Sequence, residues 1–331
     1  MPADGHLSPA GGEEEPLTLL RGMNMRCRWL LLLILLFGLT SCDRQQATRI
    51  GGGPQGGTFQ GYAEALTRVF TAVEPGRAWK VLASGGSVSN LEKLSAGRVD
   101  LALVYAGDAW LQTGRGKGQV PVRALTRLYG APAHLVVAAT SPYASVVDLT
   151  GARIAIGNPG SGTAAAARRY FASIRLWQKI VPVHIGFRHA LDELERGAVD
   201  AVWMVVGSPN PTLVAETETM GLRFIDLISE ARQSEFFRRF PFYVPRTLPP
   251  GTYPGQQRPI RTFEDSALLL GRADLPERRV RRLLDYLFSS EGHARLVRLH
   301  PVGRELTRER GLEGVSIPLH PGAELFWRGE N

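Results

Sequence analysis

The stretch IAIGNPGSGT, residues 154–163, decides the fold of this chain, and an alanine-rich run follows it at 164–167. An apolar start, a Gly/Pro/Ser turn and an alanine-rich segment predict a strand, a tight loop and a helix. The first N–H groups of such a helix are free and lie at the positive end of its dipole, so the junction is suited to bind an anion. Ser161 and Thr163 add hydroxyl groups. The alternative is that one of these two side chains only caps its own helix.

A second copy of this plan lies near residue 50, where RIGGGPQGGT (residues 49–58) leads into an amphipathic segment. Both loops follow an Arg-Ile pair and end in Gly-Thr. Further on, LEKLSAGRVD (residues 91–100) is matched by LDELERGAVD (residues 191–200), and an apolar strand follows each. Two similar βαβ units about a hundred residues apart predict a two-lobed α/β protein with one glycine loop in each lobe.

The other elements are predicted from apolar runs, glycine stops and helical periodicity. We expect strands near residue 50 and over 79–83, 101–105, 133–139, 181–185, 201–206 and 266–270. We expect helices over 59–70, 88–96, 163–174, 191–196, 212–219 and 278–288. No regular element fits 240–259, the segment 114–118 is typical of an exposed loop, and 317–323 is typical of a turn-rich tail.

Two further helix starts resemble the glycine loops. The turn 84–87 opens the helix expected at residue 88, and the turn 207–209 precedes the helix expected at residue 212. We therefore expect four helix N-termini to face one cleft between the lobes. Tyr105 and Asp108 lie at and just past the end of a predicted strand, where open α/β sheets place ligands. The alternatives are that Tyr105 is only a rim aromatic and that Asp108 is a helix cap.

The candidate ligand-binding residues lie on these loops and helix starts. Glycine allows the backbone to come close to a ligand, and the Ser, Thr and Asn side chains offer hydrogen bonds. The set is Gly57, Thr58, Phe59, Gly86, Ser87, Asn90, Tyr105, Gly160, Ser161, Gly162, Thr163, Gly207 and Ser208.

Composition indicates a globular protein of about two domains, since the 331 residues are 44% hydrophobic and 21% charged. The 39 Lys and Arg against 31 Asp and Glu give a net charge of +8. The basic residues are scattered arginines with few aromatic neighbours, which argues against nucleic acid as the partner. A basic surface suits an anionic solute or a membrane face.

The N-terminal region has the pattern of a signal peptide. Arg26 and Arg28 precede the apolar run 29–37, which is too short to span a membrane, and small residues lead to Cys42. Residues 1–22 fit no targeting pattern, so we expect translation to begin at Met23 or Met25. The other cysteine, Cys27, lies in the signal, so no disulfide, cysteine metal site or cysteine nucleophile is expected.

An enzyme is the disfavoured alternative. Gly51, Gly53 and Gly56 formally match a dinucleotide fingerprint, but the next strand ends at 82–84 without the acidic residue that would hold a ribose. The sequence has no Walker lysine and no Gly-x-Ser-x-Gly elbow, and Ser161 has no evident base. The seven histidines lack metal-ligand spacing, so His300 and His320 are expected to be structural. We predict no catalytic residues, no metal and no cofactor, with a nucleotide-dependent oxidoreductase kept as an alternative.

A set of short motifs, taken in order, resembles the TAXI family of solute-binding subunits of TRAP-type secondary transporters. The resemblance covers residue 48 to the C-terminus and departs from the family at Phe59-Gln60 and at Tyr105. The motifs are Gly56-Gly57-Thr58, SGGSVSNL (84–91), Gly97-x-x-Asp100, Gly157-x-Pro159-Gly160-Ser161-Gly162-Thr163, Gly197-x-x-Asp200-Ala201, Tyr253-Pro254-Gly255 and Pro318-x-His320-Pro321-Gly322-Ala323.

The resemblance implies a type II periplasmic-binding-protein fold, with two α/β lobes, a hinge and a cleft that closes on its ligand. It implies a small organic anion, either an amino acid such as glutamate or a dicarboxylate, and TRAP membrane subunits as partners. Gly57, Thr58, Ser87, Asn90, Ser161, Gly162 and Thr163 would contact its carboxylates. A solute sensor with a membrane signalling partner would use the same cleft and remains an alternative.

The tetrad Leu39-Thr40-Ser41-Cys42 resembles the lipobox of bacterial lipoproteins. The resemblance implies cleavage before Cys42 and acylation of its thiol, which would anchor the protein at the periplasmic face of the cytoplasmic membrane, where Asp43 favours retention. The expected organisation is an extension and signal peptide over 1–41, a tether over 42–47, lobe 1 over 48–134 plus 241–331, and lobe 2 over 135–240.

Overall fold

The computed structural model describes residues 47–113 and 121–329, which belong to one compact unit. The predicted signal peptide, Cys42 and the loop at 114–118 lie outside the described residues. Among the described helices, none combines the length and apolar character that a membrane span requires.

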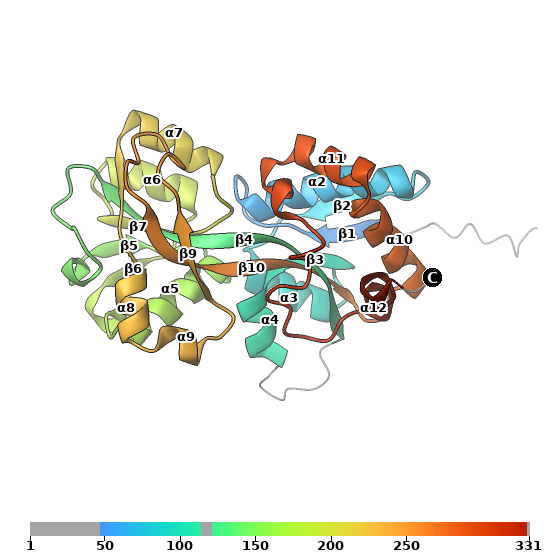
Figure 1. Cartoon of the computed structure of the whole chain (residues 1–331). Coiled ribbons are helices and arrows are strands. Elements are labelled where there is room, and N and C mark those ends of the chain that lie inside the picture. The colour runs from blue at the N-terminus through green and yellow to red at the C-terminus, as the bar shows by residue number, and fades with distance from the viewer. Residues whose placement is uncertain (1–46, 114–120, 330–331) are drawn as a thin grey trace, which may run out of the picture. The chain divides into compact units, whose positions relative to one another are not determined.

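Ten strands of the described residues form one sheet in the order β2-β1-β3-β10-β4-β7-β5-β6, with β8 paired to β4 and β9 to β10 (Figure 1). Their bounds are β1 (Thr48–Gly51), β2 (Trp79–Leu82), β3 (Leu101–Tyr105), β4 (Val122–Ala138), β5 (Arg153–Ala155), β6 (Val181–Val183), β7 (Ala201–Val205), β8 (Leu222–Phe224), β9 (Val244–Leu248) and β10 (Ile260–Arg272). β1 pairs in parallel with β2 and β3, and β5 pairs in parallel with β6 and β7. The orders 2-1-3 and 6-5-7 repeat one arrangement. We call the part built on β1–β3 lobe 1 and the part built on β5–β7 lobe 2.

The long strands β4 and β10 run antiparallel to each other and connect the lobes (Figure 1). β10 pairs with β3 of lobe 1, and the C-terminal part of β4 pairs with β7 of lobe 2. The strand predicted at 133–139 is therefore only the end of a 17-residue strand. The ladder between β4 and β10 is irregular beside Leu268 and Leu270, and such irregularities let paired strands bend.

The helices cover the sheet; α2, α3, α5, α6, α7 and α10 lie at or overlap the predicted helices, whereas α4, α8, α9, α11 and α12 were not predicted. Their bounds are α2 (Thr58–Val73), α3 (Ser87–Ser95), α4 (Ala106–Thr113), α5 (Gly162–Ser173), α6 (Phe187–Glu195), α7 (Pro211–Thr219), α8 (Ile228–Gln233), α9 (Phe236–Arg239), α10 (Glu277–Leu287), α11 (Ser290–Leu299) and α12 (Pro321–Arg328). Strands β3 and β7 are buried at every residue, as expected for continuous apolar runs covered on both faces.

The internal repeat extends to individual hydrogen bonds. In lobe 1, Arg49 donates from its backbone N to Asp100 at 2.8 Å and from its guanidinium to the carbonyl of Gly97 at 3.0 Å. In lobe 2, Arg153 makes the same two bonds to Asp200 and to Gly197, both at 2.7 Å. Gly97 and Gly197 have φ of 66° and 70°, which suits glycine after a helix end. The Arg-Ile pairs therefore start equivalent strands and clamp them to equivalent helix ends.

Two predictions about the C-terminal third are wrong. The segment 240–259 contains β9, whose residues Val244–Leu248 pair with β10; an edge strand is stabilised by its partner more than by its own pattern. The tail at 317–323 was expected to be only turns, but Pro321 begins α12. His320 accepts a hydrogen bond from the N–H of Gly322 at 3.1 Å and so caps this helix, which confirms a structural role for that histidine.

The hydrophobic core has three clusters. One contains Leu91 and Val104 of lobe 1, one contains Leu191 and Met204 of lobe 2, and the largest extends through both lobes. Leu248, Tyr253 and Ile260 belong to the lobe 2 cluster. The division at residues 134 and 240 remains a prediction, and this packing favours placing the segment 244–260 with lobe 2.

Candidate ligand-binding site

A cavity of about 360 Å³ lies between the lobes, at the N-termini of four helices of the described residues. Lobe 1 contributes the starts of α2 and α3, and lobe 2 contributes those of α5 and α6. The predicted residues that line it are Gly57, Thr58, Phe59, Gly86, Ser87, Tyr105, Ser161, Gly162 and Thr163. The cavity thus collects residues from separate parts of the sequence into one site.

In lobe 1 both helix starts are open toward the cavity. Gly57 precedes α2 and Gly86 precedes α3, and neither helix has a side-chain cap. The N–H groups of Gln60 and Ser89 donate to the carbonyls of Gly57 and Gly160, so among the described residues the first two N–H groups of each helix are left for a ligand or solvent. Gly86 has a φ of 116°, a conformation that side-chain-bearing residues rarely adopt.

In lobe 2 the start of α5 combines both interpretations of Ser161. Its hydroxyl accepts a hydrogen bond from the N–H of Ala164 at 3.0 Å, so it caps its own helix, and the residue also lines the cavity. Gly162 is required here, because a Cβ at this position would lie 2.4 Å from the ring of Tyr105. Thr163 lines the cavity one residue further on.

The fourth helix start at the cavity is that of α6, whereas the start of α7, which was also expected to face the cleft, lies off the cavity. Asn210 caps α7 by accepting hydrogen bonds from Thr212 and Leu213, and this helix start does not line the cavity. Gly186 precedes α6, offers no side-chain cap and lines the cavity.

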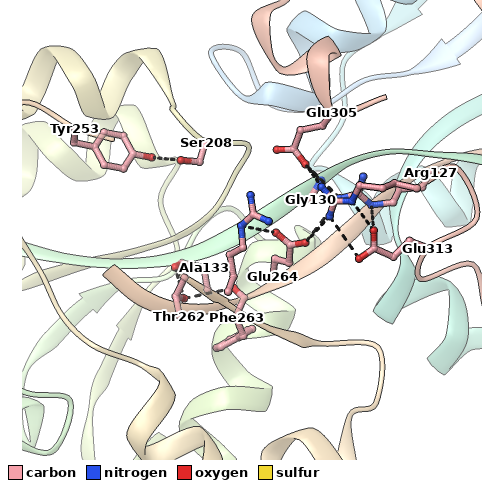
Figure 2. A network of polar contacts seen from close by, with 12 residues as sticks. Arg127, Gly130, Ala133, Ser208, Tyr253, Thr262, Phe263, Glu264, Glu305 and Glu313 are labelled. Carbon is pink, nitrogen blue, oxygen red and sulfur yellow. Dashed lines mark hydrogen bonds and ion pairs between the residues drawn. The ribbon is translucent and has the colours of Figure 1, made fainter. Parts of the chain in front are cut away.

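Gly207 and Ser208, which come just before α7, also lie off the cavity. The side chain of Ser208 instead accepts a hydrogen bond from the hydroxyl of Tyr253 at 3.3 Å (Figure 2). That hydroxyl also lies 2.8 Å from the Nε2 of His134 on β4. Burial lowers the pKa of His134 to about 4, so this histidine is neutral at pH 7.

Two other predicted residues also lie off the cavity. Asn90 is fully buried, and its amide donates to the carbonyls of Gly51, Gly52 and Leu103. It therefore joins the first glycine loop to β3. Gly160 accepts a hydrogen bond from the N–H of Ser89 and serves a contact between the lobes.

The lobes touch at several points around the cavity. The hydroxyl of Tyr105 in lobe 1 donates to the carbonyl of Val205 in lobe 2 at 2.7 Å, and burial raises the pKa of this tyrosine well above its ordinary value. Asp108, in the first turn of α4, forms an ion pair with Arg169 of α5. A Cβ on Gly85 would lie 2.9 Å from the carbonyl oxygen of Pro159, so the two loops approach as closely as glycine permits. The structure therefore represents a closed arrangement of the two lobes.

Sequence reasoning missed the α6 residues Phe187, Arg188, His189 and Asp192, all of which line the cavity. The internal repeat carried a signal for them. Residues 91–100 align with 191–200, so Gly86 before α3 aligns with Gly186 before α6, and each is the residue before its helix. The start of α6 was predicted four residues too late because only the matching segment was considered.

A cluster of charged residues lies where the lobes join, outside the cavity lining (Figure 2). The guanidinium of Arg127 on β4 is about 1% exposed and forms ion pairs with Glu264 of β10, Glu305 and Glu313 at 3.8, 3.3 and 3.9 Å. Glu305 also accepts from the N–H of Gly130 at 2.9 Å. Burial raises the pKa of Glu264. These contacts fix β4 against β10 and against the C-terminal segment.

The fold and the cleft define a two-lobed α/β protein of the type II periplasmic-binding-protein class, and this fold class was predicted correctly from the sequence. The chain belongs to the NMT1-like family, whose profile matches residues 50–330.

Solved structures with a similar fold include binding proteins and a ligand-binding core. The periplasmic aliphatic sulphonate binding protein SsuA from Escherichia coli is 16% identical, with a TM-score of 0.47 and coverage of 86% of this chain and 84% of its own. The alkanesulfonate-binding protein SsuA from Xanthomonas axonopodis pv. citri, bound to MOPS, has the same identity and coverage and a TM-score of 0.48. The GluR0 ligand-binding core from Nostoc punctiforme, in complex with L-glutamate, is 14% identical, with a TM-score of 0.48 and coverage of 76% and 99%.

Proposed function

We propose that this protein is a solute receptor that captures a small organic anion in the cleft between its lobes. The observation that carries the proposal is the convergence of four helix N-termini from both lobes on one cavity. Three of these helices lack a side-chain cap. Free N–H groups at the positive end of a helix dipole favour negative charge, and they hold it without a buried counter-charge.

A ligand in this cavity would contact both lobes at once, so its binding favours the closed arrangement. The connecting strands β4 and β10 would bend as the lobes separate. In this proposal the closed form is the one presented to TRAP-type membrane subunits, and the lipid on Cys42 holds the receptor at the periplasmic face of the cytoplasmic membrane. The transporter type and the anchor are supported by the sequence motifs alone.

The first experiment is a thermal-shift screen of residues 47–331, the compact unit. The compounds are acidic amino acids, dicarboxylates, monocarboxylates, keto acids and nucleotides. A ligand at a hundred times its dissociation constant stabilises a protein by about 2.7 kcal/mol. We expect a shift with carboxylates. A shift with nucleotides alone would support the oxidoreductase alternative and contradict the receptor.

A variant with Thr58→Val and Thr163→Val tests the site itself. Both threonines line the cavity, and valine keeps their shape while it removes the hydroxyl. A hydrogen bond to a charged group contributes about 1.5–3 kcal/mol, so we expect at least about a tenfold loss of affinity in isothermal titration. Ser161 is left intact because it caps α5.

The matched control is Thr212→Val at the start of α7, a helix start that is capped by Asn210 and lies off the cavity. It should bind as the wild type does. Equal affinity of the double variant and the wild type would place the ligand elsewhere.

A further inference from the structure

The cavity wall between the helix N–H groups is largely apolar. Phe59 of α2 and Tyr105 of β3 lie with ring centroids 4.7 Å apart on the lobe 1 side. Met204 and Val206 contribute from lobe 2. The hydroxyl of Tyr105 is engaged by the carbonyl of Val205, so only the ring of this residue is left to face a ligand.

Phe187 closes the apolar wall across the gap between the lobes. It is the first residue of α6 in lobe 2, and its ring lies 3.8 Å from where a Cβ on Gly57 of lobe 1 would be. Since Gly57 precedes α2, an aromatic ring stands directly beside one of the helix starts that would hold the anionic group. A bound molecule therefore meets donors and apolar surface within a short distance.

The charged side chains of the wall are few. Arg188 is exposed and extends toward the first glycine loop, with its Nε 3.5 Å from the Cβ position of Gly56, and among the described residues its guanidinium has solvent and not a carboxylate as its neighbour. Among the described lining residues the other ionisable side chains, apart from that of Tyr105, are Asp192 and His189, whose ring lies 4.0 Å from the Asp192 carboxylate. The cavity thus offers one unpaired guanidinium and no second one for a second acid.

The cavity volume matches a ligand with an apolar body. A cavity of about 150 Å³ lined by apolar side chains holds a benzene molecule. At about 360 Å³ this cavity has room for one acidic group together with a ring or a branched alkyl chain. A second carboxylate placed against Phe59, Phe187 or Met204 would lose its hydration without gaining a partner.

We propose that the ligand is a monoanion with an apolar body, whose acidic group is held by Arg188 and the helix N-termini and whose body packs between Phe59, Phe187 and Met204. This inference rests on the proposed receptor function and narrows its ligand class. It makes Arg188, rather than the predicted hydroxyl groups alone, the residue that selects for charge.

A matched pair of keto acids tests the inference by isothermal titration of residues 47–331. 2-Oxoglutarate and 4-methyl-2-oxopentanoate share the same acidic head, and in the second an isopropyl group replaces the distal carboxymethyl group. We expect the branched compound to bind at least tenfold more tightly, and the uncharged ketone 4-methyl-2-pentanone not to bind. Tighter binding of 2-oxoglutarate would overturn the inference and leave the receptor function standing. Failure of every carboxylate in the screen to bind would overturn both.

Two variants of α6 separate the role of Arg188 from a general effect of charge. Arg188→Gln should weaken binding of the branched keto acid at least tenfold. Arg196→Gln is the matched control, because Arg196 caps the same helix, lies off the cavity and pairs with Glu193 at 3.0 Å. It should bind as the wild type does. Equal affinity of the Arg188→Gln variant and the wild type would remove this residue from the ligand site and contradict the inference.

Discussion

At the scale of single residues, the pairing of Arg49 with Asp100 and of Arg153 with Asp200, which we call the Arg/Asp clamp, is the feature that the sequence predicted least directly. The glycine loops and the matching segments 91–100 and 191–200 were visible as repeats. The sequence did not show why both repeats have an Arg before an Ile in the first strand and an Asp after the helix. Each Arg before an Ile holds an Asp that lies after the repeat helix. A sequence shows both residues and not their pairing, since the contact spans 47 positions in lobe 2.

The clamp predicts a pH-dependent contribution to stability. Asp200 accepts hydrogen bonds from Arg153, which hold the pKa of its carboxyl below the ordinary value. A carboxyl whose pKa is lower in the folded state stabilises the fold at any pH above its ordinary pKa of about 3.9. This stabilisation is lost as the pH falls through the folded-state pKa. Asp200→Asn should therefore lower the urea midpoint at pH 7, and its difference from the wild type should shrink below pH 4.

Asp285→Asn is the control for this prediction, because within the described part of the chain the half-exposed Asp285 carboxylate pairs only with Arg281 of the same helix, α10. Exposed pairs of this kind contribute less than about 1 kcal/mol. A difference between Asp200→Asn and the wild type that stays constant from pH 7 to pH 3 would contradict the assigned role of the carboxylate.

At the scale of elements, the prediction succeeded where a segment carries its own pattern. Strands such as β3 and β7 are continuous apolar runs, and helices such as α2 have an apolar face and a glycine start. The prediction failed where another element determines the structure or position of a segment. β9 is an edge strand fixed by pairing with β10, and the cleft position of α6 rather than α7 depends on how lobe 2 packs. The helix starts could be predicted, but not which of them share one cavity.

The ion pairs between β4, β10 and the C-terminal segment predict a loss of stability when Arg127 is replaced. Arg127→Met removes a buried guanidinium from Glu264 and Glu305, but both carboxylates keep Arg310, and Glu264 also keeps Arg246. Removing the only partner of a buried charge costs about 3–5 kcal/mol. Because other arginines remain, urea unfolding should show a loss below this range, and Arg281→Met, which removes the pair with Asp285 on α10, should cost less than about 1 kcal/mol. Adding Glu264→Gln to the Arg127→Met variant should recover part of the loss; no recovery would mean that packing, not charge, sets the effect.

At the scale of the whole molecule, two lobes close on a cavity through contacts that no local pattern predicts. Asp108 was weighed as a helix cap and Tyr105 as a rim aromatic, and both turn out to make contacts from lobe 1 to lobe 2. Their partners, Arg169 and Val205, are 61 and 100 positions away. Contact between the lobes thus depends on the tertiary structure, although the sequence analysis had already selected Tyr105 and Asp108 as candidate residues.

Closure predicts a specific effect of a small substitution. In Gly85→Ala the new methyl group would lie 2.9 Å from the carbonyl oxygen of Pro159 in the other lobe. The clash is relieved when the lobes separate, so we expect weaker ligand binding with little change in the free energy of unfolding. Small-angle scattering should show that ligand compacts the wild type more than the variant. Gly76→Ala, where no atom lies within 4 Å of the new methyl, should bind normally; equal binding by both variants would mean that this contact does not limit closure.

The equivalence of Gly86 and Gly186 has a consequence for how a ligand is oriented. Two similar units present equivalent helix starts to the cavity. If the two units were identical, they would not distinguish one end of a ligand from the other. The copies differ at the next two positions, where Ser87 and Val88 in one correspond to Phe187 and Arg188 in the other. The two helix starts therefore present different side chains to the cavity, and we expect that exchanging these two pairs of residues would reverse the orientation of the bound molecule.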